Sequence, residues 1–340
     1  MRTMLSFAVG GLLALGVGSA SAQTNLNMSN WVPPGHPLTA GMMLPWSEKV
    51  TAATNGRVKF TLLPKAVAAP PATFDAVRDG LADVSLTVHG YTPGRFVLSK
   101  AVEFPFLGDD ATSVSIAYQR VYEKMLAQKN EHDGVVVLSV FTHGPGNIFN
   151  KVRPIAKVAD MEGLKIRVGG GVVNDVTKAL GVTSILKPAS QSYELMSAGV
   201  VDGVYFPKES IASFKLEGLI KYGTIVPGGL YNTSFVFMMN KEAFNKLSPE
   251  DQKAVMSVSG EALARLCGEA WDKADAHGME VMKASGADII TADAAMVQEI
   301  GARTKALEEA WYEEAKGIGI DGAAVMQSLR AEIKKVAAGG

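Results

Sequence analysis

The stretch Leu164-Lys165-Ile166-Arg167-Val168-Gly169-Gly170-Gly171 opens the series of elements that decides the fold class of this chain. Apolar and charged residues alternate up to Val168 and three glycines follow, which predicts a short strand that ends in a turn. The pattern continues with a helix, a strand, a helix and a strand, expected at 172–181, 184–187, 192–199 and 202–206. Strands that alternate with helices of this length are typical of an α/β domain with a mostly parallel sheet.

The first half of the chain shows the same alternation. We expect strands at 26–30, 57–63, 83–88 and 135–141, and helices between them at 38–54, 72–80 and 112–128. A further apolar strand is expected at 235–239, followed by Ala- and Glu-rich surface helices at 250–285 and 294–316. The 318 residues that follow residue 22 (340 minus 22) exceed what one core usually supports, so two such series predict two domains.

The N-terminus has the features of a secretory signal peptide. Arg2 precedes an apolar run from Met4 to Val17, and small residues follow it up to Ala20-Ser21-Ala22. The run is shorter than the roughly 20 apolar residues that a membrane-spanning helix needs. We therefore expect cleavage after Ala22 and a protein located in the periplasm.

The composition excludes some partners. The chain has 33 basic and 34 acidic residues, and this balance gives no reason to expect binding to nucleic acid or to an anionic membrane. Cys267 is the single cysteine, so the chain has no internal disulfide, and we interpret this residue as a small buried hydrophobe. With 47% hydrophobic residues, the chain can bury a large core instead.

Ligands of open α/β sheets bind beyond the carboxyl ends of the strands, so the residues after each expected strand are candidates for a site. They form a mixed set of aromatic, basic and hydrogen-bonding side chains, which suits a small polar solute. The candidate ligand residues are Arg167, Trp31, His36, Tyr91, His89, Phe206, Glu209, Asn147 and Asn232.

Several motifs, in the same order, resemble those of substrate-binding proteins of TRAP (tripartite ATP-independent periplasmic) transporters, the DctP type. The strongest likeness lies in 160–168 (DMEGLKIRV) and 193–203 (YELMSAGVVDG). Weaker likenesses lie at 75–83, at Phe104-Pro105-Phe106-Leu107, and at 235–240 before Leu247-Ser248-Pro249-Glu250. The resemblance covers nearly all of the chain after residue 22.

The resemblance implies a two-domain Venus-flytrap protein with mixed, mostly parallel sheets, and a long C-terminal helix behind both lobes. We expect one lobe at 23–146 with 233–265 and the other at 147–232 with 266–340. The lobes would close over a ligand in the cleft between them. Such a protein captures a small organic acid for the permease subunits of a TRAP transporter, catalyses no reaction and needs no cofactor; we expect a monomer.

The resemblance also assigns roles to single residues. Arg167 matches the family arginine that pairs with a substrate carboxylate, and a planar guanidinium can donate two parallel hydrogen bonds to one. Phe206 stands where many members carry an asparagine that holds the ligand. The segment 142–147 lacks the second arginine of sialic-acid-binding members, which favours a smaller or less polar solute.

Other readings stay open at this point. Glu209 could bind the ammonium of a small amine or amino alcohol. A secreted α/β hydrolase or dehydrogenase would also fit a two-domain cleft, although GxSxG, GxGxxG after the first strand and GxxxxGK[ST] are absent. His36, His89 and His143 follow expected strands, but their spacing matches no local zinc motif, so we expect no metal site.

Overall fold

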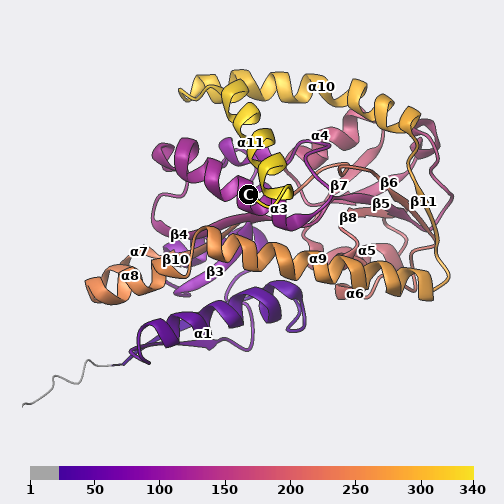
Figure 1. The fold of residues 1–340 in the computed structure, drawn as a ribbon. Coiled ribbons are helices and arrows are strands. Elements are labelled where there is room, and N and C mark those ends of the chain that lie inside the picture. Colours follow the sequence, from indigo (N-terminus) through magenta and orange to yellow (C-terminus); the bar gives the residue numbers. More distant parts are fainter. Residues whose placement is uncertain (1–22) are drawn as a thin grey trace, which may run out of the picture.

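The computed structural model describes residues 23–340 and consists of two lobes, each built on one β-sheet (Figure 1). The expected signal peptide at 1–22, with its cleavage position after Ala22, lies outside the described residues. Both sheets are mixed, and helices cover their faces, so the α/β class expected from the alternating pattern is confirmed.

The first lobe contains a sheet with the strand order β2-β1-β3-β10-β4. β1 pairs in parallel with β2 and β3, whereas β10 runs antiparallel between β3 and β4. The strands are β1 (Thr24–Met28), β2 (Val58–Leu62), β3 (Val84–Val88), β4 (Val135–Thr142) and β10 (Ser234–Asn240). The helices are α1 (Leu44–Ala53), α2 (Thr73–Arg78), α3 (Ala111–Val121), α7 (Lys241–Asn245) and α8 (Pro249–Ser257).

The second lobe contains a sheet with the strand order β11-β9-β5-β8-β6-β7. β6, β7 and β8 are parallel, and β5 runs antiparallel to both β8 and β9. The strands are β5 (Asn147–Asn150), β6 (Lys165–Val168), β7 (Thr183–Leu186), β8 (Gly203–Phe206), β9 (Tyr222–Ile225) and β11 (Asp288–Thr291). The helices are α4 (Val172–Ala179), α5 (Ser192–Ser197) and α6 (Glu209–Ser213).

The chain passes between the two sheets more than once. Residues 143–146 connect β4 to β5, and residues 226–233 return the chain from β9 to β10. The two connections lie side by side, because Gly146 N–H donates to Tyr231 O at 2.9 Å and Leu230 N–H donates to Gly146 O at 2.9 Å. This paired connection is where a hinge between the lobes would bend.

A long helix, α9 (Glu261–Ala284), makes a third link between the lobes (Figure 1). Its Asp272 accepts the backbone N–H of Ala111 at 2.6 Å, at the start of α3 in the first lobe. One turn later Asp275 accepts the backbone N–H of Glu209 at 2.7 Å, at the start of α6 in the second lobe. Carboxylates are favoured at helix N-termini, so both contacts fix α9 to its neighbours.

The expected surface helix at 250–285 is wrong in two respects. It is divided into α8 and α9 by Gly260, whose φ of 60° breaks the helical geometry. α9 also buries a continuous stripe at three- and four-residue spacing, which includes Leu263, Cys267, Trp271 and Met282. Gly268 and Gly278 belong to this stripe and allow the backbones of residues 112 and 208 to approach closely.

The remaining helices are α10 (Ala294–Gly317), close to its expected bounds, and α11 (Gly322–Ala337), which the sequence pattern did not reveal. α11 packs on α3 of the first lobe and α10 lies against α4 of the second. Strands β5, β9 and β11 were likewise not predicted. The expected helix at 38–54 begins with a π-helical turn, Leu38–Met43, before α1.

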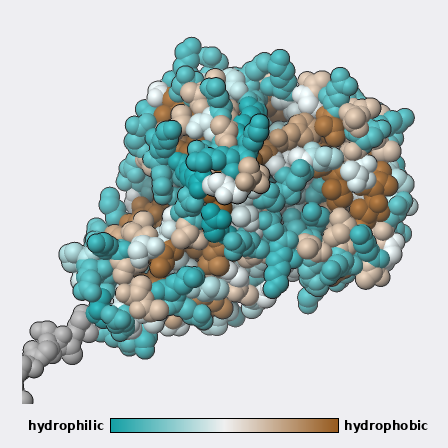
Figure 2. Space-filling model, in the orientation of Figure 1, coloured by the Kyte–Doolittle hydropathy of each residue, from teal (hydrophilic) through white to brown (hydrophobic). Residues whose placement is uncertain are grey.

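Hydrophilic side chains cover most of the face in Figure 2, with apolar patches between them. Apolar side chains exposed singly are normal for folded proteins. Within residues 23–340, no helix combines the length and the hydrophobicity that a membrane crossing requires.

Candidate functional site

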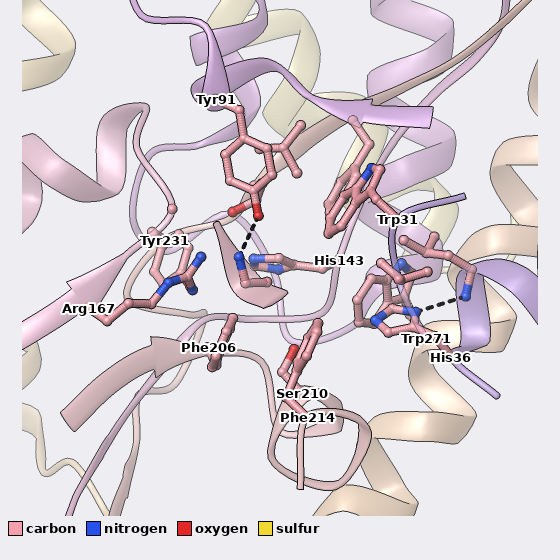
Figure 3. A pocket seen from close by; sticks show the side chains of 17 residues that line it. Trp31, His36, Tyr91, His143, Arg167, Phe206, Ser210, Phe214, Tyr231 and Trp271 are labelled. Carbon is pink, nitrogen blue, oxygen red and sulfur yellow. Dashed lines mark hydrogen bonds between the residues drawn. The ribbon is translucent and has the colours of Figure 1, made fainter. Parts of the chain in front are cut away.

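A small cavity of about 40 Å³ lies between the lobes and is lined by side chains from both (Figure 3). A volume of this size holds a few water molecules, so a solute can enter only if the lobes move apart. Most of the lining is aromatic or aliphatic. The lining residues are Trp31, Val32, His36, Leu38, Val88, Tyr91, His143, Arg167, Gly169, Ala189, Phe206, Ser210, Phe214, Tyr231, Thr233, Phe235 and Trp271.

Arg167 is the cation of this cavity. It lies on β6, is 2% exposed, and its Nε donates to the Lys187 carbonyl oxygen at 2.9 Å, which holds the side chain in place. None of the salt bridges among residues 23–340 includes Arg167. Burial lowers the pKa of Arg167, but a guanidinium stays charged in proteins. A buried, unpaired cation is costly, so this site is suited to an anion.

Two phenols lie beside the guanidinium. The Tyr91 hydroxyl oxygen accepts the backbone N–H of Ala189 at 2.9 Å, so this bond joins the first lobe to the second (Figure 3). Its own hydrogen remains able to donate to a ligand. Burial raises the pKa of both Tyr91 and Tyr231, so both phenols are neutral donors at neutral pH. Arg167 and the two phenols together can surround a carboxylate.

Aromatic rings form the walls. The Phe206 ring lies 4.5 Å from the Arg167 guanidinium carbon and stacks on Phe214 with ring centroids 5.7 Å apart. Trp31 meets Tyr91 edge to face at 5.7 Å. Rings arranged around one cation leave space that a flat, apolar body with one anionic group would complement.

His36 and Glu209 meet at the side of the cavity away from Arg167. His36 Nε2 lies 3.3 Å from Glu209 Oε1, and both side chains are buried. His36 Nδ1 accepts the Leu38 backbone N–H at 3.2 Å, which requires a neutral imidazole. Burial lowers the pKa of His36 to about 3 and raises that of Glu209 to about 8. The contact therefore joins a neutral ring to a carboxyl group that is largely protonated at neutral pH, and it is not an ion pair.

His143 lies between these two sides of the cavity (Figure 3). Its ring meets Tyr231 at 5.3 Å and Trp271 at 5.9 Å, in both cases edge to face. Its Nδ1 contacts the carbonyl oxygen of Gly144. Burial lowers the pKa of His143 to about 4, so the ring is neutral at neutral pH.

Five of the nine candidate residues line the cavity: Trp31, His36, Tyr91, Arg167 and Phe206. The other four do not. Glu209 lies behind His36, and Asn147 connects the two chain crossings by donating to Pro145 O and accepting from Val226 N. His89 bonds to Ser234 and to His132 within a buried network, and the amide nitrogen of Asn232 has no partner in the described chain.

Sequence reasoning missed the residues that reach the cavity from the later segments. Tyr231 and Thr233 lie on the return connection, Phe235 is the second residue of β10, and Phe214 follows α6. Trp271 comes from α9, where a tryptophan within the apolar stripe was the available signal. None of these positions follows a strand of the predicted α/β series, which is why the rule for strand ends did not select them.

Within residues 23–340, no group of three or more His, Cys, Asp or Glu side chains is arranged to hold a metal ion. The polar atoms of the cavity are instead distributed singly around its apolar walls. This arrangement suits recognition of a small organic solute.

Comparison with known proteins agrees with this geometry. The family model for bacterial extracellular solute-binding proteins, family 7 (DctP), matches residues 28–315. The outer membrane transporter protein TsaT of Comamonas testosteroni is 30% identical over 94% of this chain and 95% of its own length.

Solved structures are similar over nearly the whole chain. A TRAP periplasmic solute-binding protein from Bordetella bronchiseptica, with bound (R)- and (S)-mandelate, is 48% identical with a TM-score of 0.90, over 92% of this chain and 99% of that one. A marine metagenome TRAP protein specific for aromatic acid ligands, in complex with metahydroxyphenylacetate, is 35% identical with a TM-score of 0.87. The match covers 92% of this chain and 99% of that one. A TRAP solute-binding protein from Rhodoferax ferrireducens with copurified benzoate is 28% identical with a TM-score of 0.87. The match covers 92% of this chain and 98% of that one.

Proposed function

This chain belongs to family 7 of the bacterial extracellular solute-binding proteins, the DctP family of TRAP transporters, and we propose that its solute is an aromatic monocarboxylate. It is a binding protein and not an enzyme. The proposal rests on one observation above all. The buried guanidinium of Arg167 has no carboxylate partner among residues 23–340 and faces a cavity with aromatic walls.

The lining favours one carboxylate over two. Arg167 is the single Lys or Arg among the residues that line the cavity, and Trp31 and Trp271 lie on the side away from it (Figure 3). A second carboxylate would be transferred from water to these rings without a countercharge, which is strongly unfavourable. An aromatic ring would instead bury apolar surface there, at about 25 cal/mol per Å².

The solved relatives support the same class of solute. Mandelate, metahydroxyphenylacetate and benzoate, bound by the three proteins described above, each combine one carboxylate with one benzene ring. Arg167, Tyr91 and Tyr231 would hold the carboxylate of such a solute, and the aromatic walls would enclose its ring.

An amine ligand has less support. Because burial raises the pKa of Glu209 to about 8, this carboxyl group carries little charge at neutral pH. Glu209 is also separated from the cavity by His36 and Ser210. An ammonium would therefore lack an anionic partner and would meet the Arg167 cation, which repels it.

The proposal includes the route of the solute. The protein is exported through the signal peptide at 1–22, works in the periplasm and passes its solute to the TRAP permease subunits. Closure of the lobes would bury the ligand, and the bond from Ala189 N–H to Tyr91 would form only when the lobes meet.

The test is a calorimetric and thermal-shift screen of residues 23–340. The acids are benzoate, phenylacetate, mandelate and 3-hydroxybenzoate; succinate and benzylamine serve as comparisons. An acid that binds only the folded state stabilises it by about 2.7 kcal/mol at a hundredfold excess over its Kd. We expect shifts with the aromatic acids alone. Binding of succinate or benzylamine in their place would contradict the proposal.

A further inference from the structure

The two histidines of the cavity hold their protons on different nitrogens. His36 Nδ1 accepts the backbone N–H of Leu38, so the ring hydrogen is on Nε2. His143 Nδ1 contacts the carbonyl oxygen of Gly144, and a carbonyl only accepts, so the hydrogen of His143 is on Nδ1. The backbone therefore sets both tautomers before any ligand arrives.

This assignment leaves His143 Nε2 as a hydrogen-bond acceptor on a side chain that is 5% exposed. No hydrogen bond of the described residues includes His143 Nε2. The other tautomer, with its hydrogen on Nε2, would leave the Nδ1 lone pair facing the oxygen of the Gly144 carbonyl, which also only accepts. An acceptor without a protein donor, on a largely buried side chain that lines the cavity, favours a ligand that brings a donor.

The other groups around the cavity are mainly donors. Arg167 has only N–H groups, and Tyr91 already accepts from Ala189. These groups are suited to the carboxylate oxygens. The fixed tautomer of His143 instead places an acceptor, Nε2, in the site, and this acceptor can be satisfied by a hydrogen that the solute donates.

We infer that the solute of this cavity is an aromatic acid that carries a hydroxyl group, and that the hydroxyl donates its hydrogen to His143 Nε2. This inference rests on the proposed function, since the carboxylate anchored by Arg167 fixes the orientation of the solute. His143 is then a specificity-determining residue: it separates hydroxylated acids from unsubstituted acids of the same shape.

The size of the preference follows from the unpaired acceptor. An unsubstituted acid displaces water from His143 Nε2 but has no hydrogen to donate to it. The loss of this hydrogen bond corresponds to about fivefold to 150-fold in affinity. Sites built to bond a substrate hydroxyl reject analogues that lack it for this reason.

The experiment measures the Kd of two matched pairs by calorimetry: mandelate against phenylacetate, and 3-hydroxybenzoate against benzoate. In the parent protein, the hydroxylated acid of at least one pair should bind at least fivefold more tightly. His143→Phe keeps an aromatic ring against Tyr231 and Trp271 and should bring that ratio close to one. His277→Phe, the same change at an exposed position of α9, is the matched control and should keep the parent ratio.

The outcomes separate the inference from the proposed function. If the unsubstituted acids bind as tightly as the hydroxylated ones, or if His143→Phe keeps the preference, the role of His143 is overturned while acid binding stands. If no aromatic acid binds, the proposed function is wrong, and the inference about His143, which rests on it, is wrong with it.

A second measurement uses the parent protein and does not depend on the folding of a variant. Nitrogen-15 spectra of protein labelled in its five histidines report an unprotonated ring nitrogen directly. The hydroxylated acid should shift the unprotonated Nε2 resonance of His143 more than its unsubstituted partner does. Equal spectra for the two acids would overturn the inference.

Discussion

The guanidinium carbon of Arg167 lies 4.5 Å above the ring of Phe206, so the cation that faces the cavity rests on an aromatic wall of the same lobe. The two residues lie on different strands, β6 and β8, which are neighbours in the sheet. A buried cation over a ring face gains about 2 kcal/mol. This contact replaces part of the hydration that Arg167 loses on burial, and it leaves the donors of the guanidinium available to a ligand.

Arg167→Ala should weaken an aromatic acid by about thirtyfold to several thousandfold, because loss of one partner of a desolvated charge pair costs roughly 2–5 kcal/mol. Arg167→Lys should also bind poorly, since an ammonium lacks the two parallel donors. Calorimetry with the acid found in the screen measures both. Arg265→Ala, an exposed arginine on α9, is the control. Binding by Arg167→Ala at the affinity of the parent would remove this residue as the anchor.

Phe206→Asn should change which acids bind. The amide offers hydrogen bonds to polar groups of a solute but loses the ring face under Arg167 and the stacking on Phe214. We expect the Kd of benzoate to rise and the Kd of succinate to fall, both measured by calorimetry. Phe206→Leu, which stays apolar, should weaken benzoate without gaining succinate. An unchanged order of affinities in Phe206→Asn would show that this position does not select the solute.

Tyr91→Phe should make closure of the lobes less favourable. Without the hydroxyl, the Ala189 N–H loses its acceptor in the closed form, which costs about 1–3 kcal/mol. Small-angle scattering of the parent should show a smaller radius with ligand than without. The variant should need about fivefold to 150-fold more ligand for the same change. Tyr193→Phe, at an exposed tyrosine, should behave as the parent. A parent profile that stays constant at saturating ligand would count against closure.

Glu209→Gln should stabilise the protein increasingly as the pH rises. Burial raises the pKa of Glu209 in the folded state to about 8, above the usual value of 4.5, so its contribution to stability is complete below about 4.5 and is lost as the pH rises towards 8. Glutamine has no proton to lose. The difference in thermal midpoint, variant minus parent, should therefore grow between pH 5 and pH 8.

The ionisable groups around Glu209 do not reverse the direction of this pH dependence. His36 is neutral throughout this range, because burial lowers its pKa to about 3. Burial also raises the pKa of Asp275, to about 7. Lys208, which is next to Glu209 in the chain, is the same in both proteins. Glu269→Gln, at an exposed position of α9 with no ion-pair partner among the described residues, should give a difference that stays flat with pH. A flat difference for Glu209→Gln would mean that Glu209 is ionised in the folded protein.

Protein expressed with its native leader should have Gln23 as its first residue. The basic start, apolar run and Ala20-Ser21-Ala22 end match the requirements of a signal peptidase. Mass spectrometry of the periplasmic fraction measures the N-terminus directly. A product that keeps Met1 and stays in the cytosol would contradict export.

The order of strands and helices could be predicted where the local pattern carries the information. The series that begins at residue 164 was placed within a residue or two, because β6, α4, β7, α5 and β8 are short apolar or amphipathic segments bounded by glycine and proline. Strands β5, β9 and β11 have only four residues each and were missed. Their pairing partners lie far away in the chain, so their formation is a tertiary event.

The sequence by itself determined the α/β class, the family likeness and the arginine of the site, because motifs and periodicity are local properties of the chain. Only the tertiary structure decided what surrounds that arginine. Trp271 and Tyr231 enter the cavity because α9 and the return connection lie between the lobes, and His143 is held in one tautomer by the Gly144 carbonyl. Side-chain surroundings and hydrogen-bond partners depend on segments distant in sequence, and packing brings these together only in the folded chain.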